Sequence, residues 1–240
     1  MLSKFGLFVT VVVASTAFSA CTEPPPDPVF VRGSAIDGGV DGDGDVDSGP
    51  IGPDDSGSTC TGEEYPCGPY GTGRCEVIAD HSFIPANEEA EALAGDDGLL
   101  DLHDLFADES ITGILLFGTA GWCSACGVES DWLHDAYDDF QNVDGHGGRI
   151  EVVAVVFEGS TPGVPATAAY AESYATREGF TFPAVADTQG DILYYFDAQS
   201  SPGNIMVDAT EMRIHRVIQG VDASGISGVL FTLDGSVTCR

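Results

Sequence analysis

The stretch Gly118-Thr-Ala-Gly-Trp-Cys-Ser-Ala-Cys126 decides how the rest of the chain is interpreted. A continuous apolar run, residues 111–117, precedes it and is typical of a buried strand. Behind it, residues 131–140 carry apolar side chains at helical spacing with acids on the other face. Cys123 and Cys126 therefore form a Cys-x-x-Cys pair between a strand and a helix, a context that indicates redox chemistry.

The place of the first cysteine favours a reactive thiolate. The N-terminus of a helix has unsatisfied backbone N–H groups and the positive end of the macrodipole. Such positions lower a thiol pKa to roughly 3.5–7.5. Cys126 lies one turn further on, within reach of a disulfide with Cys123. We expect Cys123 to attack a substrate disulfide and Cys126 to resolve the mixed disulfide.

Short apolar runs alternate with amphipathic stretches through the remainder of the C-terminal part. The expected helices are residues 166–178 and a short one that begins near Asp222. The expected strands are 150–157, 182–186, 204–207 and 212–218, of which the last two form a hairpin around residues 208–211. This order predicts one α/β domain over residues 60–240, with helices on both faces of its sheet.

The motif and its surroundings resemble the thioredoxin superfamily, most of all the TlpA-like, AhpC/TSA-related branch of extracytoplasmic thiol-disulfide oxidoreductases. Trp122 matches the family's Trp-Cys-x-x-Cys, and Glu129 matches an acid that is common three residues after the second cysteine. Residues 100–105 resemble the family's Leu-Ser-Asp-Leu turn, and Ser201-Pro202 resembles its cis-proline loop. The resemblance covers roughly residues 65–235 and is carried by a fairly specific combination of motifs.

The resemblance implies a thioredoxin-like fold, a central mixed sheet flanked by helices. An extra strand and helix are then inserted between the Cys-x-x-Cys helix and the cis-proline. The implied site has Cys123 and Cys126 as catalytic residues, supported by Trp122, Glu129, Ser201 and Pro202.

Two details of that implied site concern single residues. In the family, the cis-proline packs against the cysteine pair and leaves the backbone of the preceding residue, here Ser201, free to pair with an extended substrate. Thioredoxins also place a buried carboxylate six residues before the first cysteine, where this chain has Phe117. Cys126 must therefore lose its proton by another route.

Residues 1–20 have the pattern of a secretory signal peptide. Lys4 is followed by a short apolar run, residues 5–14, that is too short and wrongly flanked to span a bilayer. Phe18-Ser-Ala-Cys21 resembles the bacterial lipobox, which implies lipidation of Cys21; cleavage after Ser19 is the alternative. We expect an exported, lipid-anchored protein of the cell envelope that faces the periplasm or exterior, or else a soluble secreted one.

Residues 21–59 are expected to form a tether, because this Pro- and Gly-rich acidic segment has almost nothing to bury. Acidic side chains dominate the whole chain, with 39 Asp and Glu against 8 Lys and Arg, for a formal net charge of -31. This balance excludes nucleic acid as a partner and electrostatic docking on anionic lipid. Redox partners are expected to be neutral or basic where they dock.

The 7 cysteines divide into three groups. One is the lipidation candidate Cys21 and two form the redox motif. The other four are expected to form two structural disulfides with three open connectivities, among Cys60, Cys67, Cys75 and Cys239. The five histidines show no metal-ligand spacing, so no metal and no other cofactor is expected.

The leading functional hypothesis is an extracytoplasmic thiol-disulfide oxidoreductase. Its substrates would be protein or small-molecule thiols and disulfides, and a partner protein would recycle it. A peroxiredoxin-like peroxidase is one alternative, but it requires Thr and Pro where the chain has Ala120 and Leu116. The other is a redox-silent thioredoxin-fold binding or structural module. So short a loop makes the Cys123–Cys126 bond an inefficient staple, which disfavours that reading.

Overall fold

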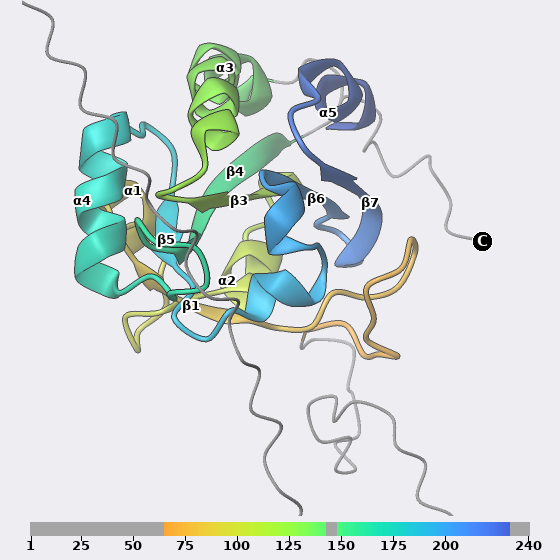
Figure 1. Cartoon of the computed structure of the whole chain (residues 1–240). Coiled ribbons are helices and arrows are strands. Elements are labelled where there is room, and N and C mark those ends of the chain that lie inside the picture. Colours follow the sequence, from red (N-terminus) through yellow and green to blue (C-terminus); the bar gives the residue numbers. More distant parts are fainter. Residues whose placement is uncertain (1–64, 143–147, 231–240) are drawn as a thin grey trace, which may run out of the picture. The chain divides into compact units, whose positions relative to one another are not determined.

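The computed structural model describes residues 65–142 and 148–230, and Figure 1 shows how their helices and strands are arranged. The expectations for the signal peptide (1–20), Cys21, the tether to residue 59, Cys60 and Cys239 lie outside the described residues. Within the described ranges, no helix combines the length and apolar character needed to cross a bilayer.

A mixed seven-stranded sheet forms the centre of the described domain, with the strand order β2-β1-β5-β4-β3-β6-β7. β3, β4 and β5 are parallel to one another, whereas β1, β2, β6 and β7 pair antiparallel with their neighbours. The strands are β1 (Ser82–Pro85), β2 (Leu100–Asp101), β3 (Ile111–Ala120), β4 (Arg149–Glu158), β5 (Ala184–Ala186), β6 (Gly203–Asp208) and β7 (Arg213–Gln219).

The two longest apolar runs of the sequence form the middle of this sheet. All residues of β3 from Gly113 to Ala120 are buried, and so are all residues of β4 after Arg149. Continuous apolar runs of this kind belong to strands covered on both faces. The strands predicted at 111–117 and 150–157 are therefore confirmed, as is the antiparallel hairpin of β6 and β7.

Helices cover the sheet on its two sides. Figure 1 shows α3 and α5 above the sheet and α2 below it. The α4–β5 unit follows β4 and precedes the Pro202 loop, which is where the sequence places an inserted helix and strand. The helices are α1 (Glu88–Glu91), α2 (Leu102–Ala107), α3 (Ser124–Gln141), α4 (Ala168–Glu178) and α5 (Ala223–Leu230), with short 3-10 helices η1 (Asp191–Tyr194) and η2 (Ala198–Ser200).

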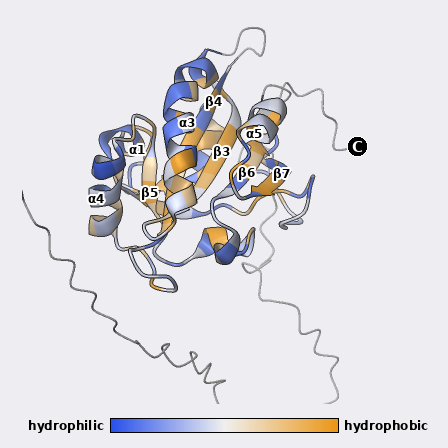
Figure 2. Ribbon diagram, turned by 45° about the horizontal axis from the view of Figure 1, so that its top comes forward, coloured by the Kyte–Doolittle hydropathy of each residue, from blue (hydrophilic) through white to orange (hydrophobic). Residues whose placement is uncertain are grey.

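The amphipathic sequence of α3 corresponds to one buried face and one exposed face of the helix. Leu133 and Phe140 are buried against the sheet, while Asp131 and Asp135 are exposed. Figure 2 shows the same division, with hydrophilic colour on the outer face of α3 and apolar colour along β3 and β4. The acidic stripe of this helix is a solvated face.

The N-terminal part of the domain was not predicted as strands. β1 and β2 are only four and two residues long, too short to show a hydrophobic period. Residues 75–78 also run along the outer edge of β7, where the Cys75 N–H donates to the Ile214 carbonyl (2.7 Å) and the Ile78 N–H to the Met212 carbonyl (2.9 Å). This segment covers an edge that would otherwise present unpaired backbone groups.

Candidate active site

The redox motif forms the turn between β3 and α3. The Cys123 N–H donates to the Ala120 carbonyl (3.0 Å), and Cys123 is the N-cap residue of α3. Cys123 and Cys126 form a disulfide with an S–S length of 2.02 Å and a Cα–Cα distance of 5.3 Å. The strand-to-helix context inferred from the sequence is therefore the context in which the pair lies.

The two sulfurs have different surroundings. Cys123 retains 7% exposure, whereas Cys126 is fully buried. The Cys126 N–H donates to the Cys123 Sγ (3.1 Å), and the first turn of α3 contains no acid that would oppose a thiolate there. Because backbone N–H donors and the helix dipole stabilise negative charge, this end of α3 suits a Cys123 thiolate. Cys123 is the accessible member of the pair.

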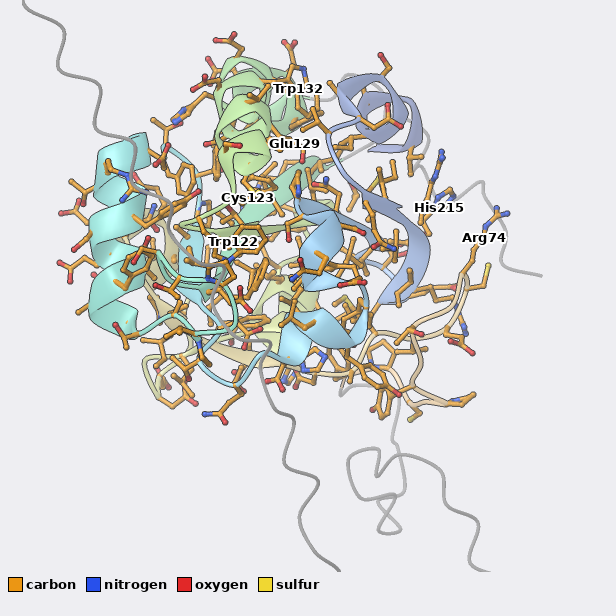
Figure 3. The ribbon with its side chains drawn as sticks, in the orientation of Figure 1. Arg74, Trp122, Cys123, Glu129, Trp132 and His215 are labelled. Carbon is orange, nitrogen blue, oxygen red and sulfur yellow. A yellow bond between two sulfur atoms is a disulfide. The ribbon has the colours of Figure 1, made fainter. Side chains whose placement is uncertain are left out.

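Trp122 is held beside the pair by the end of β4. Its indole Nε1–H donates to Glu158 Oε2 at 2.6 Å, and the Glu158 backbone carbonyl accepts from the Gly121 N–H at 3.1 Å. Glu158 is 7% exposed, so both hydrogen bonds lie in a largely water-excluded place. Figure 3 shows Trp122 and Cys123 next to each other where α3 begins. Glu158 therefore fixes both the backbone and the side chain of the turn before Cys123.

The proline loop reaches the same edge of the sheet. Gly203 pairs with Gly118 across β6 and β3, so Pro202 lies at the end of β3 from which the motif emerges. The Ser201–Pro202 peptide bond is cis, as the resemblance implies. The Ser201 N–H and Oγ–H both donate to the Ala198 carbonyl, at 3.3 and 2.7 Å. The expectation that the Ser201 backbone is free is therefore not met by its N–H group.

Phe196 fills the space behind the motif and the proline loop. A Cβ atom on either Gly118 or Gly203 would collide with its ring. The ring also meets Phe157 edge-on, with centroids 5.6 Å apart. The two paired glycines are thus required by the close approach of one aromatic ring, and this packing ties β3 to the loop that precedes β6.

Glu129 lies on α3, a short distance along the helix from the cysteine pair. It follows Cys126 by one turn on the inner face of α3 and is fully buried. Asn204 Nδ2–H donates to Glu129 Oε2 at 2.8 Å, and the Asp222 N–H approaches Oε1 at 3.4 Å. Among the ion pairs of the described residues, none involves Glu129. Burial raises the pKa of its carboxyl, and the two hydrogen bonds oppose that rise.

The buried carboxylate near the cysteine pair comes from a different element than the position occupied by Phe117. Phe117 is fully buried in β3, and its partner across the sheet in β6 is Asn204. The strand position that carries a carboxylate in thioredoxins is apolar here, and the buried carboxylate comes from α3 instead. Asn204 joins the two by pairing with Phe117 through the backbone and with Glu129 through its side chain.

The remaining cysteines in the described part are away from this edge. Cys67 and Cys75 are both disulfide-bonded, and Cys75 lies beside β7 in the segment that covers its edge. Figure 3 shows the neighbouring Arg74 on the far side of β7 from Cys123. The pairing with Cys60 and Cys239 stays a prediction, because those two residues lie outside the described ranges.

Two histidines of the described part, His81 and His134, lie within hydrogen-bond distance of neighbouring groups. His81 Nε2 is 2.7 Å from the Tyr195 hydroxyl, and His134 Nε2 is 3.4 Å from the Glu178 carbonyl. In residues 65–142 and 148–230, no three His, Cys, Asp or Glu side chains gather in a way that could hold a metal ion.

Three residues of the site were missed by the sequence analysis: Glu158, Phe196 and Asn204. Two of them left a signal, because a polar residue stands at the end or beginning of an apolar strand. Buried polar side chains need partners, so such positions point to a contact even before the partner is known. Phe196 left no comparable signal, since an aromatic residue in a short apolar stretch is ordinary core.

The chain was compared with known proteins. No protein-family model matches it, and no curated protein matches its sequence. A putative thiol:disulfide interchange protein DsbE from Chlorobium tepidum is similar in structure, with a TM-score of 0.50, 16% identity, and coverage of 69% of this chain and 100% of that one. A secreted thiol-disulfide isomerase from Corynebacterium glutamicum has a TM-score of 0.48, 19% identity, and coverage of 68% and 87%. At such identities the DsbE likeness shows the fold alone, which is thioredoxin-like.

Proposed function

We propose that the chain is an extracytoplasmic thiol-disulfide oxidoreductase that acts by dithiol-disulfide exchange at Cys123 and Cys126. The observation that carries the proposal is the asymmetry of the pair: Cys123, at a helix N-terminus, retains 7% exposure, whereas Cys126 is fully buried one turn further on. A dithiol with one accessible low-pKa thiol and one shielded resolving thiol suits exchange chemistry.

In the reducing direction, the Cys123 thiolate attacks one sulfur of a substrate disulfide and expels the other as a thiolate. Cys126 then loses its proton and attacks the Cys123 sulfur of the mixed disulfide, which releases the second substrate thiolate. The protein dithiol becomes the Cys123–Cys126 disulfide, and two electrons pass to the substrate. The oxidising direction is the same sequence reversed, and the partner's potential decides between them.

Glu129 is the group that supports the proton transfer of the second step. It is a buried carboxylate on the same helix face as Cys126, and burial raises its pKa, which makes it a stronger base than an exposed carboxylate. It supplies from α3 the base that Phe117 cannot provide from β3.

Two further groups border the reacting sulfur. Trp122, held by Glu158, presents an apolar surface beside Cys123. The Ser201 N–H is occupied by the Ala198 carbonyl, so an extended substrate chain would pair with the proline loop through the Ser201 carbonyl.

A redox titration tests the proposal. The purified chain is equilibrated in dithiol buffers of graded potential, free thiols are alkylated, and the modified cysteines are identified by mass spectrometry. We expect one two-electron transition at Cys123 and Cys126, lost in Cys123→Ser, while Cys67 and Cys75 stay oxidised. Ser124→Ala is the matched control from the same turn and should leave the transition in place. No transition at this pair would overturn the proposal.

Two further measurements on the same protein distinguish the proposed function from the two alternatives. A peroxidase would form a sulfenic acid on Cys123 rapidly with peroxide in a Cys126→Ser variant. A redox-silent module would leave the Cys123 thiol, after mild reduction, no more reactive to alkylation at neutral pH than a free-thiol compound. We expect slow sulfenic acid formation and fast alkylation.

The export of the chain and its lipid anchor at Cys21 belong to the same proposal. Disulfides at Cys67 and Cys75 support export, because structural disulfides persist in oxidising compartments outside the cytoplasm. Expression in a bacterial host with radiolabelled fatty acid should label the chain and leave it in the membrane fraction. Cys21→Ala should abolish the label, and an unlabelled wild type that is found in the soluble fraction contradicts the anchor.

A further inference from the structure

Two buried polar side chains meet between α3 and β6, and one of their atoms is unsatisfied. Glu129 and Asn204 are both fully buried and are joined by the 2.8 Å bond from Asn204 Nδ2–H to Glu129 Oε2. Asn204 Oδ1 is buried and has no hydrogen-bond partner within the described part of the chain. A buried acceptor without a partner costs free energy, so its presence beside the redox pair requires an explanation.

The orientation of the amide matches one protonation state of Glu129. An N–H donor facing the carboxylate stabilises the ionised form. A protonated Glu129 carries an O–H donor and needs an acceptor from the same neighbour. A half-turn of the Asn204 amide about its last side-chain bond supplies that acceptor, because the amide carries its oxygen and nitrogen at equivalent positions.

We propose that Asn204 is the positioning residue for the proton that passes between Cys126 and Glu129. Its amide donates to the ionised carboxylate and, after rotation, accepts from the protonated one. The Oδ1 atom that lacks a partner is then the acceptor for the protonated form of Glu129. This inference rests on the proposed exchange function, and it names the partner of Glu129 that makes both states tolerable in a fully buried place.

A side chain at this position can serve both states of Glu129 only if it both donates and accepts hydrogen bonds. Val or Leu offers neither a donor nor an acceptor, and Asp would add a second carboxylate that repels the first. A hydroxyl, as in Thr, both donates and accepts. Position 204 lies in a strand between Gly203 and Ile205, so the β-branched pair Thr and Val suits its backbone and differs only in the hydroxyl.

The proton moves as follows. Once the substrate is bound to Cys123 as a mixed disulfide, the Cys126 thiol gives its proton to the Glu129 carboxylate. The Asn204 amide turns to accept the new O–H, and the Cys126 thiolate attacks the Cys123 sulfur and releases the substrate thiolate. The departing thiolate takes a proton from solvent. When the pair is reduced for the next cycle, Cys126 is expelled as a thiolate and takes back the proton that Glu129 holds.

The titratable groups around Glu129 are few. Cys126 and Cys123 lie on its own helix, and Asp222, before α5, faces it with a backbone N–H and a carboxylate of like charge. The strand side contributes Asn204 and the apolar Phe117. Asn204 is therefore the strongest donor to Glu129 that the described residues offer, so its loss should raise the pKa of the Glu129 carboxyl.

The test compares Asn204→Val with Asn204→Thr in the full chain. The first measurement is the titration of the Glu129 carboxyl by carbon NMR, assigned with Glu129→Gln. The second is the stopped-flow reaction of the reduced protein with 4,4′-dithiodipyridine from about pH 5 to about pH 9, in which the second thiol released reports the resolving step. Circular dichroism checks that both variants fold.

We expect Asn204→Val to move the Glu129 titration and the rising limb of the resolving rate upward by about one pH unit, which slows resolution about tenfold below that limb. Asn204→Thr should recover at least half of the shift in both measurements. Unchanged values in Asn204→Val, or equal shifts in Thr and Val, would overturn the inference. A wild-type protein that releases no second thiol would instead contradict the exchange function, while the NMR titration would still test the pairing of Asn204 with Glu129.

Discussion

Glu129 and Glu151 are two buried glutamates at opposite ends of the α3–sheet interface, and they are satisfied in different ways. Glu151, in β4, is 2% exposed and receives the Tyr137 hydroxyl at 2.8 Å and the Arg149 Nε–H at 3.0 Å. Glu129 is fully buried and has an amide and one long backbone contact but no cation. Burial raises the pKa of both carboxyls, but at Glu151 a guanidinium and a phenol oppose it.

The difference separates a carboxylate that holds structure from one that is available for proton transfer. A charge paired with a guanidinium in a buried place gains little by accepting a proton, because it would lose that attraction; the Arg149 guanidinium lies between Glu151 and Asp108, at 3.0 Å from each. A charge with only neutral partners loses much less when it is neutralised. At the α3–sheet interface, the redox end therefore carries the second kind, Glu129 of α3, and the opposite end carries the first, Glu151 of β4.

The largest effect is expected on stability, when the ion pair between Arg149 and Glu151 is broken. Arg149→Met leaves Glu151 buried without its cation and should lower the free energy of unfolding by about 3–5 kcal/mol, since an unpaired buried charge is costly. The resolving rate of the redox pair should stay within about threefold of the wild type, because Arg149 lies at the far end of β4. Urea unfolding of the oxidised proteins measures the first quantity.

The control for Arg149→Met is an ion pair at the surface. Glu211 is 65% exposed in its pair with Arg213, so Glu211→Gln should cost less than about 1 kcal/mol. A loss in Arg149→Met as small as that of Glu211→Gln would show that Glu151 is not held by its cation, and the contrast with Glu129 would fail.

The second effect concerns the rate at the redox end. Glu129→Gln keeps the size of the side chain and removes the base, so the resolving step should slow by about a hundredfold at neutral pH. Glu151→Gln is the matched variant from the same helix interface, and it should change that rate by less than about threefold. Stopped-flow release of the second thiol measures both. Equal rates in the two variants would remove Glu129 from the proton path.

Much of the fold followed from the sequence because its central elements carry long periodic signals. The apolar runs that became β3 and β4 and the amphipathic stretch that became α3 each extend over seven residues or more, which sets them apart from loops. The sequence did not predict β1, β2 or the 75–78 segment, because their pairing depends on distant partners. Ile84 pairs with Ala186, and Cys75 pairs with Ile214. Pairings between distant segments leave no local pattern.

The residues of the candidate site also fall into two groups, those that the sequence predicted and those that only the fold showed. Cys123 and Cys126 were found from their spacing and context, whereas Trp122, Glu129 and Pro202 were found through the family resemblance. Asn204 and Glu158 became visible when the fold brought β6 and β4 to the motif. A polar residue in an apolar strand shows that a contact is needed, but it takes the strand register to show with what.

The smallest expected effect is on the pH dependence of stability. Because burial raises the pKa of Glu129 in the folded state, the folded protein binds this proton more tightly than the unfolded chain does. The stability it contributes is fully present below the unfolded-state pKa and is lost as pH rises through the folded-state pKa.

Glu129→Gln does not titrate, so its melting temperature relative to the wild type should rise with pH, by about 2–4 °C for each 1 kcal/mol that the wild type loses. Burial also raises the pKa of Glu151, so its titration acts on stability with the same sign, but Glu151→Gln should in addition lower the melting temperature at neutral pH, because it leaves Arg149 without its buried counter-charge. Scanning calorimetry of the oxidised proteins across this range measures both differences. A fall of similar size in the two variants would mean that Glu129 is held as a structural charge, and the distinction between the two glutamates would be wrong.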